Sequence, residues 1–457
     1  MAFNKSSGRR HVAAVVAIAA SLAMTLTACS GNNAGTGSTT SAPPAQSPAA
    51  SATDLTGNIT LWHFFTDREA TVIQSSIDAF TAANPGITVD VVSGQDDDKM
   101  RTAIAAGQPI DVGISYSSDQ IGPLCSTGAF LDLGPYIQRD NIDLSQIPDV
   151  VQSYTQFEGT RCSLPMLADT TGLYYNKDLF AAAGITDPPK TLDELAADAI
   201  KLTTKNPDGS IKTLGFMPLM EYYESNASNM AVMAGAKWLN DDNKTSAIGS
   251  DPNWTTLLNW QQKLINDLGG YKALSDWFAA AGDEFSDQND FETGRVAMEI
   301  DGEWRVAFIN DEAPDLNYGT SPMPTLDPSR YGATLIDGNL VGIPKGSPNP
   351  DLAWELVKYL ALDTDAQVAM GNGLKNVPTI KSAVTSPNLE TSPQYQTFLD
   401  AFTNPNSSTE PRTIVGTEYG DIMSTFIQDW ESGAQTDLAA GLANVDQQIN
   451  AAIALGG

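Results

Sequence analysis

The 457-residue sequence has few of the residues on which most hydrolases and nucleic-acid-binding proteins depend. It holds two histidines, three cysteines and 25 Lys and Arg against 55 Asp and Glu, a formal net charge of −30. Such a charge opposes binding to nucleic acid and to anionic lipid headgroups. The scarcity of histidine excludes a His-cluster zinc site, and no G-x-S-x-G elbow or Walker A loop is present. The sequence therefore gives no sign of a metal centre, a cofactor or a nucleic-acid partner.

The sequence also lacks an apolar run long enough for a comfortable membrane span. The run "VAAVVAIAASLAMTL" follows the basic residues Lys5, Arg9 and Arg10, as in an export signal. "LTAC" (residues 26–29) resembles a bacterial lipobox, which predicts removal of residues 1–28 and lipidation of Cys29. A plain secretory signal that happens to end in Cys is the other interpretation. Two acyl chains would hold the protein stably at the extracytoplasmic face of the cell membrane.

Cleavage at this point changes the composition of the mature chain. Residues 1–28 contain His11 and three of the 25 Lys and Arg but none of the 55 acids, so the formal net charge falls from −30 to −33. His63 is then the one histidine left, and a Ser-His-Asp triad would have to use it. Residues 30–53 contain neither charge nor a large apolar side chain, so residues 29–53 are expected to form a flexible tether. About 400 residues remain, enough for two domains.

Two cysteines, Cys125 and Cys162, remain after Cys29. In an exported protein we expect a disulfide between them, and two buried thiols are the alternative. The bond would close a loop of 37 residues. The chain-entropy model assigns about 3–4 kcal/mol of stabilisation to a loop of that length.

The folded part opens with strands that alternate with helices. Strands are predicted over 58–64, 87–92 and 109–116, with a helix after Thr66 and a short helix that ends at Gly107. Thr66 and Glu69 have the spacing of a capping box. This alternation predicts a parallel sheet, whose strands carry ligand-binding residues at their carboxyl ends. The residues at those ends are His63, Phe64, Phe65, Gln95, Asp97, Asp98, Ser115 and Tyr116.

The second half is richer in helices. Residues 188–203 predict a helix with a capping box formed by Thr191 and Glu194, and residues 220–310 are mostly helical in pattern. "GNLVGIPKG" (338–346) predicts a strand and a turn. Asn349-Pro350 then opens a further helix, because proline is well tolerated at the first helical position.

Four stretches together resemble a known family. They are "ITLWHFF…AFTAANPGITVDVV…RTAIAAGQPIDV", "SLPMLADTTGLYYNKDLFAAAGITDPPKTLDEL", "FETGRVAMEIDGEWRVAFI" and "GNLVGIPKGSPNPDLAWELVKYL". Their order, over about residues 58–380, is similar to that of the maltose-binding-protein-like extracellular solute-binding proteins of ABC importers. The resemblance implies an α/β fold of two lobes, with a hinge of crossing strands and a ligand cleft between the lobes. It also implies a protein that binds a carbohydrate and delivers it to separate permease subunits, as a monomer and without catalysis.

The resemblance divides the folded part between two lobes. The first lobe would hold residues 54–165 and 320–360, and the second residues 166–319 and 361–457. "CSLPML" would be the first crossing strand, so that Asp169 emerges into the cleft, where a carboxylate can accept two sugar hydroxyl groups. Helix capping, or pairing with Lys177, is the other interpretation of Asp169.

Further candidates follow from the chemistry of sugar recognition, in which rings stack on sugar faces and planar polar groups bind hydroxyls. Trp304 matches the cleft tryptophan of the family, between Glu303 and Arg305 on what we expect to be a partly exposed turn. Gly302 would allow close backbone approach, and only one of Phe64 and Phe65 should face the cleft. The remaining candidates are Glu221, Tyr222, Trp277, Gly338 and Asn339 in "DGN", and Arg412 in "EPRTIVG".

Other functions compete with sugar binding. Acids are plentiful, so an exported glycosidase with paired carboxylates is the main rival. A lipid-anchored adhesin would show repeats or large flat surfaces, and the sequence shows no repeat. Within solute binding, the ligand could also be a glycerophosphodiester or a polyamine. Scarce Lys and Arg disfavour a phosphate-bearing ligand and favour an uncharged sugar.

Overall fold

The computed structural model describes residue 48 and residues 55–456. The expected signal peptide, the lipidation residue Cys29 and nearly all of the tether therefore lie outside the described residues. None of the helices in the described part is both long and apolar enough to cross a bilayer.

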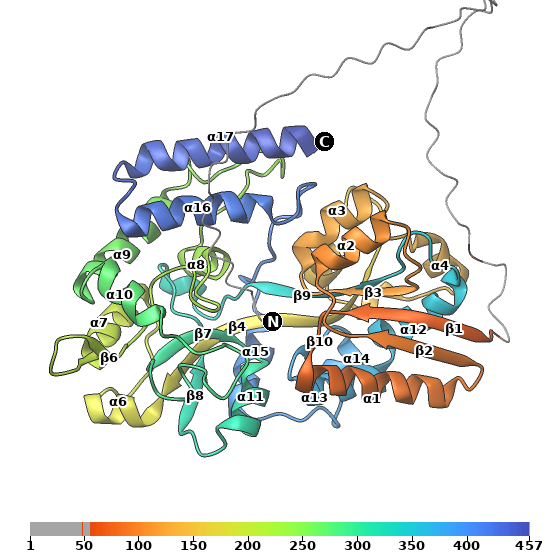
Figure 1. Ribbon diagram of the computed structural model, residues 1–457, viewed down its shortest axis with the longest axis horizontal. Coiled ribbons are helices and arrows are strands. Elements are labelled where there is room, and N and C mark those ends of the chain that lie inside the picture. Colours follow the sequence, from red (N-terminus) through yellow and green to blue (C-terminus); the bar gives the residue numbers. More distant parts are fainter. Residues whose placement is uncertain (1–47, 49–54, 457) are drawn as a thin grey trace, which may run out of the picture. The chain divides into compact units, whose positions relative to one another are not determined.

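The first lobe is built on the sheet that the alternating pattern predicts (Figure 1). β1 lies between β2 and β3 and runs parallel to both; Leu61 is the register partner of Val91 on one side and of Val112 on the other. The elements of this lobe are β1 (Gly57–His63), α1 (Asp67–Ala83), β2 (Ile87–Val92), α2 (Asp97–Ala105), β3 (Val112–Ser115), α3 (Ile121–Ser126), α4 (Gly134–Arg139) and α5 (Asp149–Ser153). Later in the chain follow α12 (Pro350–Leu362), α13 (Thr364–Leu374), β10 (Val377–Pro378) and α14 (Lys381–Val384).

Two apolar clusters fill the two faces of this sheet. Ile73, Ile77 and Phe80 of α1 pack with α12 and α13 in one cluster. Met100 of α2 and Ile121 of α3 belong to the other. Figure 1 shows α1 and α13 on one side of the strands and α2 and α3 on the other. The helical spacing of apolar residues is thus explained by burial of one helix face against the sheet.

The 13-residue strand β4 (Leu164–Asn176) passes from the first lobe into the second. Its first half pairs antiparallel with β9 (Ile336–Gly342) and β10, and Leu164, Met166 and Leu167 pack in the first lobe. Its second half pairs with β7 (Met298–Gly302) and β8 (Tyr318–Ser321), and Leu173 and Tyr174 pack in the second lobe. One strand therefore contributes to two separate cores, as the sequence predicts for a crossing strand.

The second lobe has its own apolar core, which includes Trp254, Phe216 and Met298. Its remaining elements are α6 (Lys177–Ala183), α7 (Leu192–Leu202), β5 (Thr204–Lys205), β6 (Ile211–Thr213), α8 (Ala227–Ala234), α9 (Pro252–Asp267), α10 (Tyr271–Phe278), α11 (Arg305–Glu312), α16 (Glu418–Ser432) and α17 (Leu438–Gly456). α15 (Pro393–Phe402) places Phe398 in this core and Leu399 in a first-lobe cluster. The fold is α/β with two lobes joined by crossing strands.

Local signals in the sequence have mixed outcomes. The capping box at Thr191 and Glu194 is confirmed at the start of α7. The box expected at Thr66 and Glu69 is wrong, since Thr66 makes no side-chain cap hydrogen bond. Asp67 has a φ of 48° there, so the first turn does not have the geometry that a capping box needs.

The packing of α13 differs from the lobe division expected at residue 360. Met370 and Leu374 belong to the same cluster as Ile59 of β1 and Ile77 of α1. The chain therefore stays in the first lobe after α12 ends. The length of α12 does not reveal this in the sequence.

Candidate ligand-binding site

The crossing strands bring two aspartates face to face. Asp169 of β4 and Asp337 of β9 are register partners in the antiparallel pairing. The Asp337 carboxylate accepts hydrogen bonds from the backbone N–H groups of Ser118 and Gly338, both at 2.7 Å, and from Ser117 Oγ at 3.1 Å. Burial, and then the charge of Asp337, raises the pKa of Asp169 well above its usual value.

Asp169 also forms a small polar network with the second lobe. Asn376 Nδ2 donates to Asp169 Oδ1 at 2.5 Å and to Glu303 Oε1 at 3.1 Å. Glu303 accepts a further bond of 2.7 Å from the backbone N–H of Thr170. Its pKa is raised well above the usual value by burial and then by the charge of Asp169. Asp169 does not cap α6, because Asn176 provides that cap. Asp169 also forms no ion pair with Lys177.

Trp304 lies between β7 and α11, directly after Glu303. Its ring is half-buried and lies over Gly302, where a Cβ atom would meet Trp304 Cη2 at 2.2 Å. Gly302 therefore allows the close ring–backbone approach that the sequence suggests. The Tyr174 hydroxyl donates to the carbonyl oxygen of Gly302 at 2.8 Å and holds this end of β7.

The neighbours of Trp304 are more deeply buried than the sequence predicts. Glu303 and Arg305 have no exposed surface. Arg305 pairs with Asp301 at 2.5 Å and with Glu292 at 3.3 Å. The expectation of a partly exposed turn on both sides of Trp304 is wrong, because these ion pairs hold the charged groups inside the second lobe.

The two phenylalanines that follow β1 both pack against the first-lobe core but differ in burial. Phe65 is 3% exposed and belongs to the first-lobe core, whereas Phe64 is half-buried and meets the half-buried Tyr116 edge to face, with centroids 6.0 Å apart. His63 is buried, and burial lowers the pKa of its imidazole to about 4. Phe64 and Tyr116 are therefore the aromatic candidates on the first lobe.

Asn339 follows Asp337 by two residues on β9, so that the two side chains share a face of the strand. Its side chain is 3% exposed, and its Nδ2 donates to the carbonyl oxygen of Tyr116 at 3.4 Å. Asn339 Oδ1 has no hydrogen-bond partner. Gly338 lies between the two, and a Cβ atom there would come within 2.4 Å of the carbonyl oxygen of Leu167.

The structure does not bring the other predicted ligand-binding residues to the place where β4 and β9 cross. Tyr222 and Trp277 are 1% and 6% exposed in the second-lobe core, and the Tyr222 hydroxyl donates to Asp290. Glu221 is exposed beside that core. Gln95 donates to the backbone of Ser93, and Asp98 is an exposed partner of Arg101. Aromatic residues in a helical region fit a core as well as a wall, which is why the sequence did not separate them.

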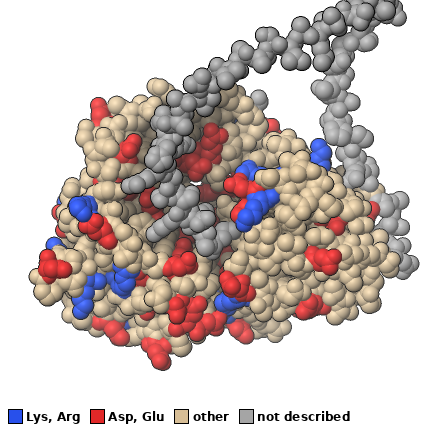
Figure 2. Space-filling view, viewed as in Figure 1, with Lys and Arg blue, Asp and Glu red and all other residues tan. Residues whose placement is uncertain are grey.

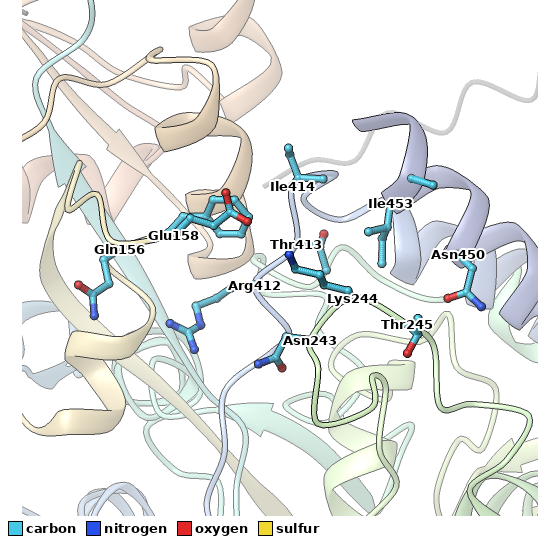
Figure 3. Close-up of a pocket in the computed structure, with 12 residues that line it drawn as sticks. Gln156, Glu158, Asn243, Lys244, Thr245, Arg412, Thr413, Ile414, Asn450 and Ile453 are labelled. Carbon is cyan, nitrogen blue, oxygen red and sulfur yellow. The ribbon is translucent and has the colours of Figure 1, made fainter. Parts of the chain in front are cut away.

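Arg412 faces a different space. Its Nη1 donates to the carbonyl oxygen of Ser153, and it lines a cavity of about 630 Å³ (Figure 3). Figure 3 shows Arg412 between the loop that carries Gln156 and the side chain of Asn243. The other residues that line the cavity are Phe157, Glu158, Lys244, Thr245, Thr413, Ile414, Asn450, Ile453 and Ala454. Of the predicted ligand-binding residues, only Arg412 lies here.

Two acids that the sequence analysis did not select, Asp119 and Glu410, join the site. Ser117 Oγ lies 2.9 Å from Asp119 Oδ1 as well as 3.1 Å from Asp337 Oδ2. Burial, and then the charge of Asp337, raises the pKa of Asp119 to about 7. Burial and the charge of Asp119 raise the pKa of Glu410. Figure 2 shows acidic side chains gathered in a hollow of the face in view.

The described residues contain no group of three or more His, Cys, Asp or Glu side chains arranged to hold a metal ion. The residues described above contribute aromatic rings, carboxylates and amides. Such groups can stack on a sugar face and bind hydroxyl groups.

Comparison with known proteins agrees with this fold. A family model described as bacterial extracellular solute-binding protein matches residues 66–367. The maltotriose-binding protein of Pyrococcus abyssi is 23% identical over 406 residues, which cover 86% of this chain and 82% of that protein. The maltodextrin-binding protein MdxE of Bacillus subtilis is 26% identical over 274 residues, which cover 57% of this chain and 58% of that protein.

Solved structures of similar proteins extend the match to almost the whole described chain. CpMnBP1 with mannotriose bound has a TM-score of 0.78 at 24% identity, covering 86% of this chain and 99% of that chain. The sugar-binding protein MalE of Xanthomonas citri has a TM-score of 0.70 at 22% identity, covering 87% and 98%. These likenesses confirm the two-lobed fold. Because the family model spans well over half of the sequence, the chain belongs to the bacterial extracellular solute-binding proteins.

Proposed function

We propose that this protein captures a carbohydrate, most simply an oligosaccharide, in the cleft between its lobes and delivers it to the permease of an ABC transporter. The names of the relatives support this ligand class, since they bind maltotriose and maltodextrin, and the similar structure of CpMnBP1 holds mannotriose. The protein would act by binding alone, without turnover.

One arrangement carries the proposal: Trp304 directly follows Glu303, and Asn376 donates to both Glu303 and Asp169 where the strands cross. The ring offers a face for C–H stacking, and Asp169 offers carboxylate oxygens to hydroxyl groups. Phe64 and Tyr116 would form the facing wall, with Asn339 between them and the strands. A ligand that touches both lobes stabilises the closed arrangement, because it gains contacts there that the open arrangement lacks.

A panel of mono- and oligosaccharides tests the proposal directly. We expect maltotriose, mannotriose or a related oligosaccharide to raise the melting temperature and to bind in calorimetry, since a ligand selective for the folded state stabilises it. Chromatography of the same mixtures should return the sugar intact. Cleaved sugar would favour a glycosidase, and no binding by any sugar would remove the proposal.

We also propose that the chain is exported, cleaved before Cys29 and held at the extracytoplasmic face by lipid on that residue. Membership of an extracellular family supports export. Mass spectrometry of the membrane-bound protein should find diacylglycerol on Cys29, and a Cys29→Ser variant should be released from the membrane.

A disulfide between Cys125 and Cys162 belongs to the same proposal. The two sulfur atoms are placed 2.08 Å apart. For the lobes, we propose residues 54–163 in the first and 177–319 in the second, with the crossing strand β4 shared between them, and residues 361–374 in the first. Limited proteolysis of the ligand-free protein should cut between these units.

A further inference from the structure

Three aspartates, Asp119, Asp169 and Asp337, meet where the strands cross. Asp169 and Asp337 are direct partners across β4 and β9, a position in which side-chain Cβ atoms lie about 4.5–5.5 Å apart and like charges repel. One hydroxyl, Ser117 Oγ, is within hydrogen-bond distance of both Asp119 and Asp337. Three carboxylates therefore share a small volume at the base of the cleft.

In the part of the chain that the structure describes, these three carboxylates have no cationic side chain as an ion-pair partner. Among the described residues, no Lys or Arg forms an ion pair with any of the three aspartates. The fully buried Asp301 does have such a partner, since it pairs with Arg305 at 2.5 Å. The three aspartates lack a counter-charge of this kind.

A second observation comes from buried amides beside the aspartates. Gln120 and Asn339 are each 3% exposed, and their side-chain oxygens have no hydrogen-bond partner. Gln120 Nε2 donates to Asp119 at 3.4 Å, and Asn339 shares the face of β9 that carries Asp337. Buried polar oxygens normally have a partner, so these two leave acceptor capacity unused next to three carboxylates.

The site therefore has an excess of acceptors and needs donors. A protonated amine carries three N–H donors, no acceptor and the missing positive charge. A sugar hydroxyl donates one hydrogen bond and brings no charge. A metal ion is the other candidate cation, but the described residues contain no cluster that could hold one.

We propose that the base of the cleft binds the protonated amino group of a carbohydrate, so that the ligand is an amino sugar with a free amine. This inference rests on the proposed function, because it specifies which carbohydrate the cleft takes. The three aspartates would surround the ammonium group, and Trp304 would stack on the sugar ring. This proposal replaces the uncharged sugar, which the sequence favours as the ligand, with a sugar that carries a positive charge.

Matched triplets of sugars test the proposal. Each triplet has a free amine, an N-acetylated amine or a hydroxyl at the same position: glucosamine, N-acetylglucosamine and glucose, with their β-1,4-linked trimers, and the corresponding mannose and galactose series. We expect calorimetry to show at least about tenfold tighter binding of the free amine in one series. The advantage should shrink in 0.5 M NaCl, because salt screens charge pairing.

Variants of the aspartates locate the effect. Asp337→Asn and, separately, Asp169→Asn should remove most of the preference for the amine, measured as the ratio of its affinity to that of the neutral members of the same triplet. Asp276→Asn, which removes an exposed acid paired with Lys272, should change neither value. Two variants are used because Asp337 accepts backbone hydrogen bonds whose loss alone could disturb the local structure.

The outcomes separate the inference from the proposed function. Neutral sugars that bind as tightly as their amines would overturn the inference and leave carbohydrate capture in place. Failure of every sugar would overturn both. Tight binding of spermidine with no binding of any sugar would also overturn both, since the amine would then be recognised without a carbohydrate.

Discussion

At the scale of single residues, the ring of Trp304 is the group on which the proposed sugar contact depends most. The ring is half-buried and packs closely over the backbone of Gly302. We expect Trp304→Ala to weaken binding of the identified sugar at least tenfold, about 1.4 kcal/mol, because the stacking face is lost. Trp304→Phe keeps a ring and should lose less. Calorimetry measures both, and unchanged affinity in the alanine variant would contradict the assignment.

Gly302 provides an independent test of the same contact. A methyl group at this position would lie 2.2 Å from the Trp304 ring, so Gly302→Ala must displace that ring. We expect a loss of affinity close to that of Trp304→Ala. In the double variant the two losses should not add, since both act on one group. Additive losses would show that Gly302 acts independently of Trp304.

The sequence identified some residues of the site and missed others for a physical reason. Asp169 and Trp304 lie next to local features, a strand end and a Gly-Glu-Trp turn, that can be read without the fold. Asn376 reaches the site because β10, which follows it, pairs with β4, and Asp119 reaches it because β3, which precedes it, pairs with β9. Asp337 stood in "DGN" beside two chosen residues, and its register partner was invisible before the strands were paired.

At the scale of helices and strands, one ion pair joins the lobes directly. Arg68 of α1 pairs with Asp311 of α11 at 2.6 Å and also donates to the carbonyl oxygen of Gly373. Its guanidinium group lies 5.5 Å from the ring centroid of Phe308. Since α1 packs in the first lobe and α11 in the second, this contact exists only when the lobes are in the arrangement seen here.

Asp311→Asn should therefore speed ligand release. The pair is partly exposed, so we expect a change of about two- to fivefold in the dissociation rate, and a smaller one at high salt. Stopped-flow fluorescence measures the rate. Asp267→Asn breaks a comparable surface pair with Lys263 within α9 and serves as the control. Equal rates in wild type and Asp311→Asn would exclude a role for this pair in closure.

The proposed disulfide acts at the same scale, because it joins α3 to the segment before β4. Replacement of both Cys125 and Cys162 by alanine should lower the free energy of unfolding by about 3–4 kcal/mol. Urea unfolding measures the change, and thiol titration of the unfolded wild type should detect no free thiol at these positions. Two titratable thiols in the wild type would contradict the bond.

The elements themselves were the most predictable level of the structure. The strands β1, β2 and β3 and the helix α7 follow from alternation, periodicity and one capping box. The antiparallel partners of β4 do not, because strand pairing depends on contacts between residues more than 100 positions apart, such as Asp169 and Asp337. For the same reason, the sequence does not predict that α13 packs in the first lobe.

At the scale of the whole molecule, the many buried acids predict an unusual dependence of stability on pH. Burial and neighbouring charges raise the pKa of Asp119 to about 7, and burial raises that of Glu431 to about 7 and of Asp97 to about 8. In the unfolded chain these carboxyls titrate near pH 4. Between these values the folded state binds more protons than the unfolded state, so stability falls as the pH rises from about 4 to 8.

His63 changes the balance only at the acidic end of this range. Burial lowers its pKa to about 4, so the stabilisation from its neutral form is complete above about pH 6.5 and is lost as the pH falls through 4. Several acids act against one histidine, so the net stability still falls as the pH rises from about 5.5 to 8. We predict that the ligand-free protein melts roughly 3–6 °C higher at pH 5.5 than at pH 8.

Asp337→Asn tests whether the crossing point contributes to this dependence. The amide cannot ionise, so the charge that raises the pKa values of Asp119 and Asp169 is removed, and the fall in melting temperature between pH 5.5 and 8 should become smaller. Differential scanning calorimetry of both proteins measures it, with Asp276→Asn as the control for loss of an exposed acid. A wild-type protein that melts higher at pH 8 than at pH 5.5 would contradict the prediction, because the buried carboxyls would then be stabilised in their charged form by the fold itself.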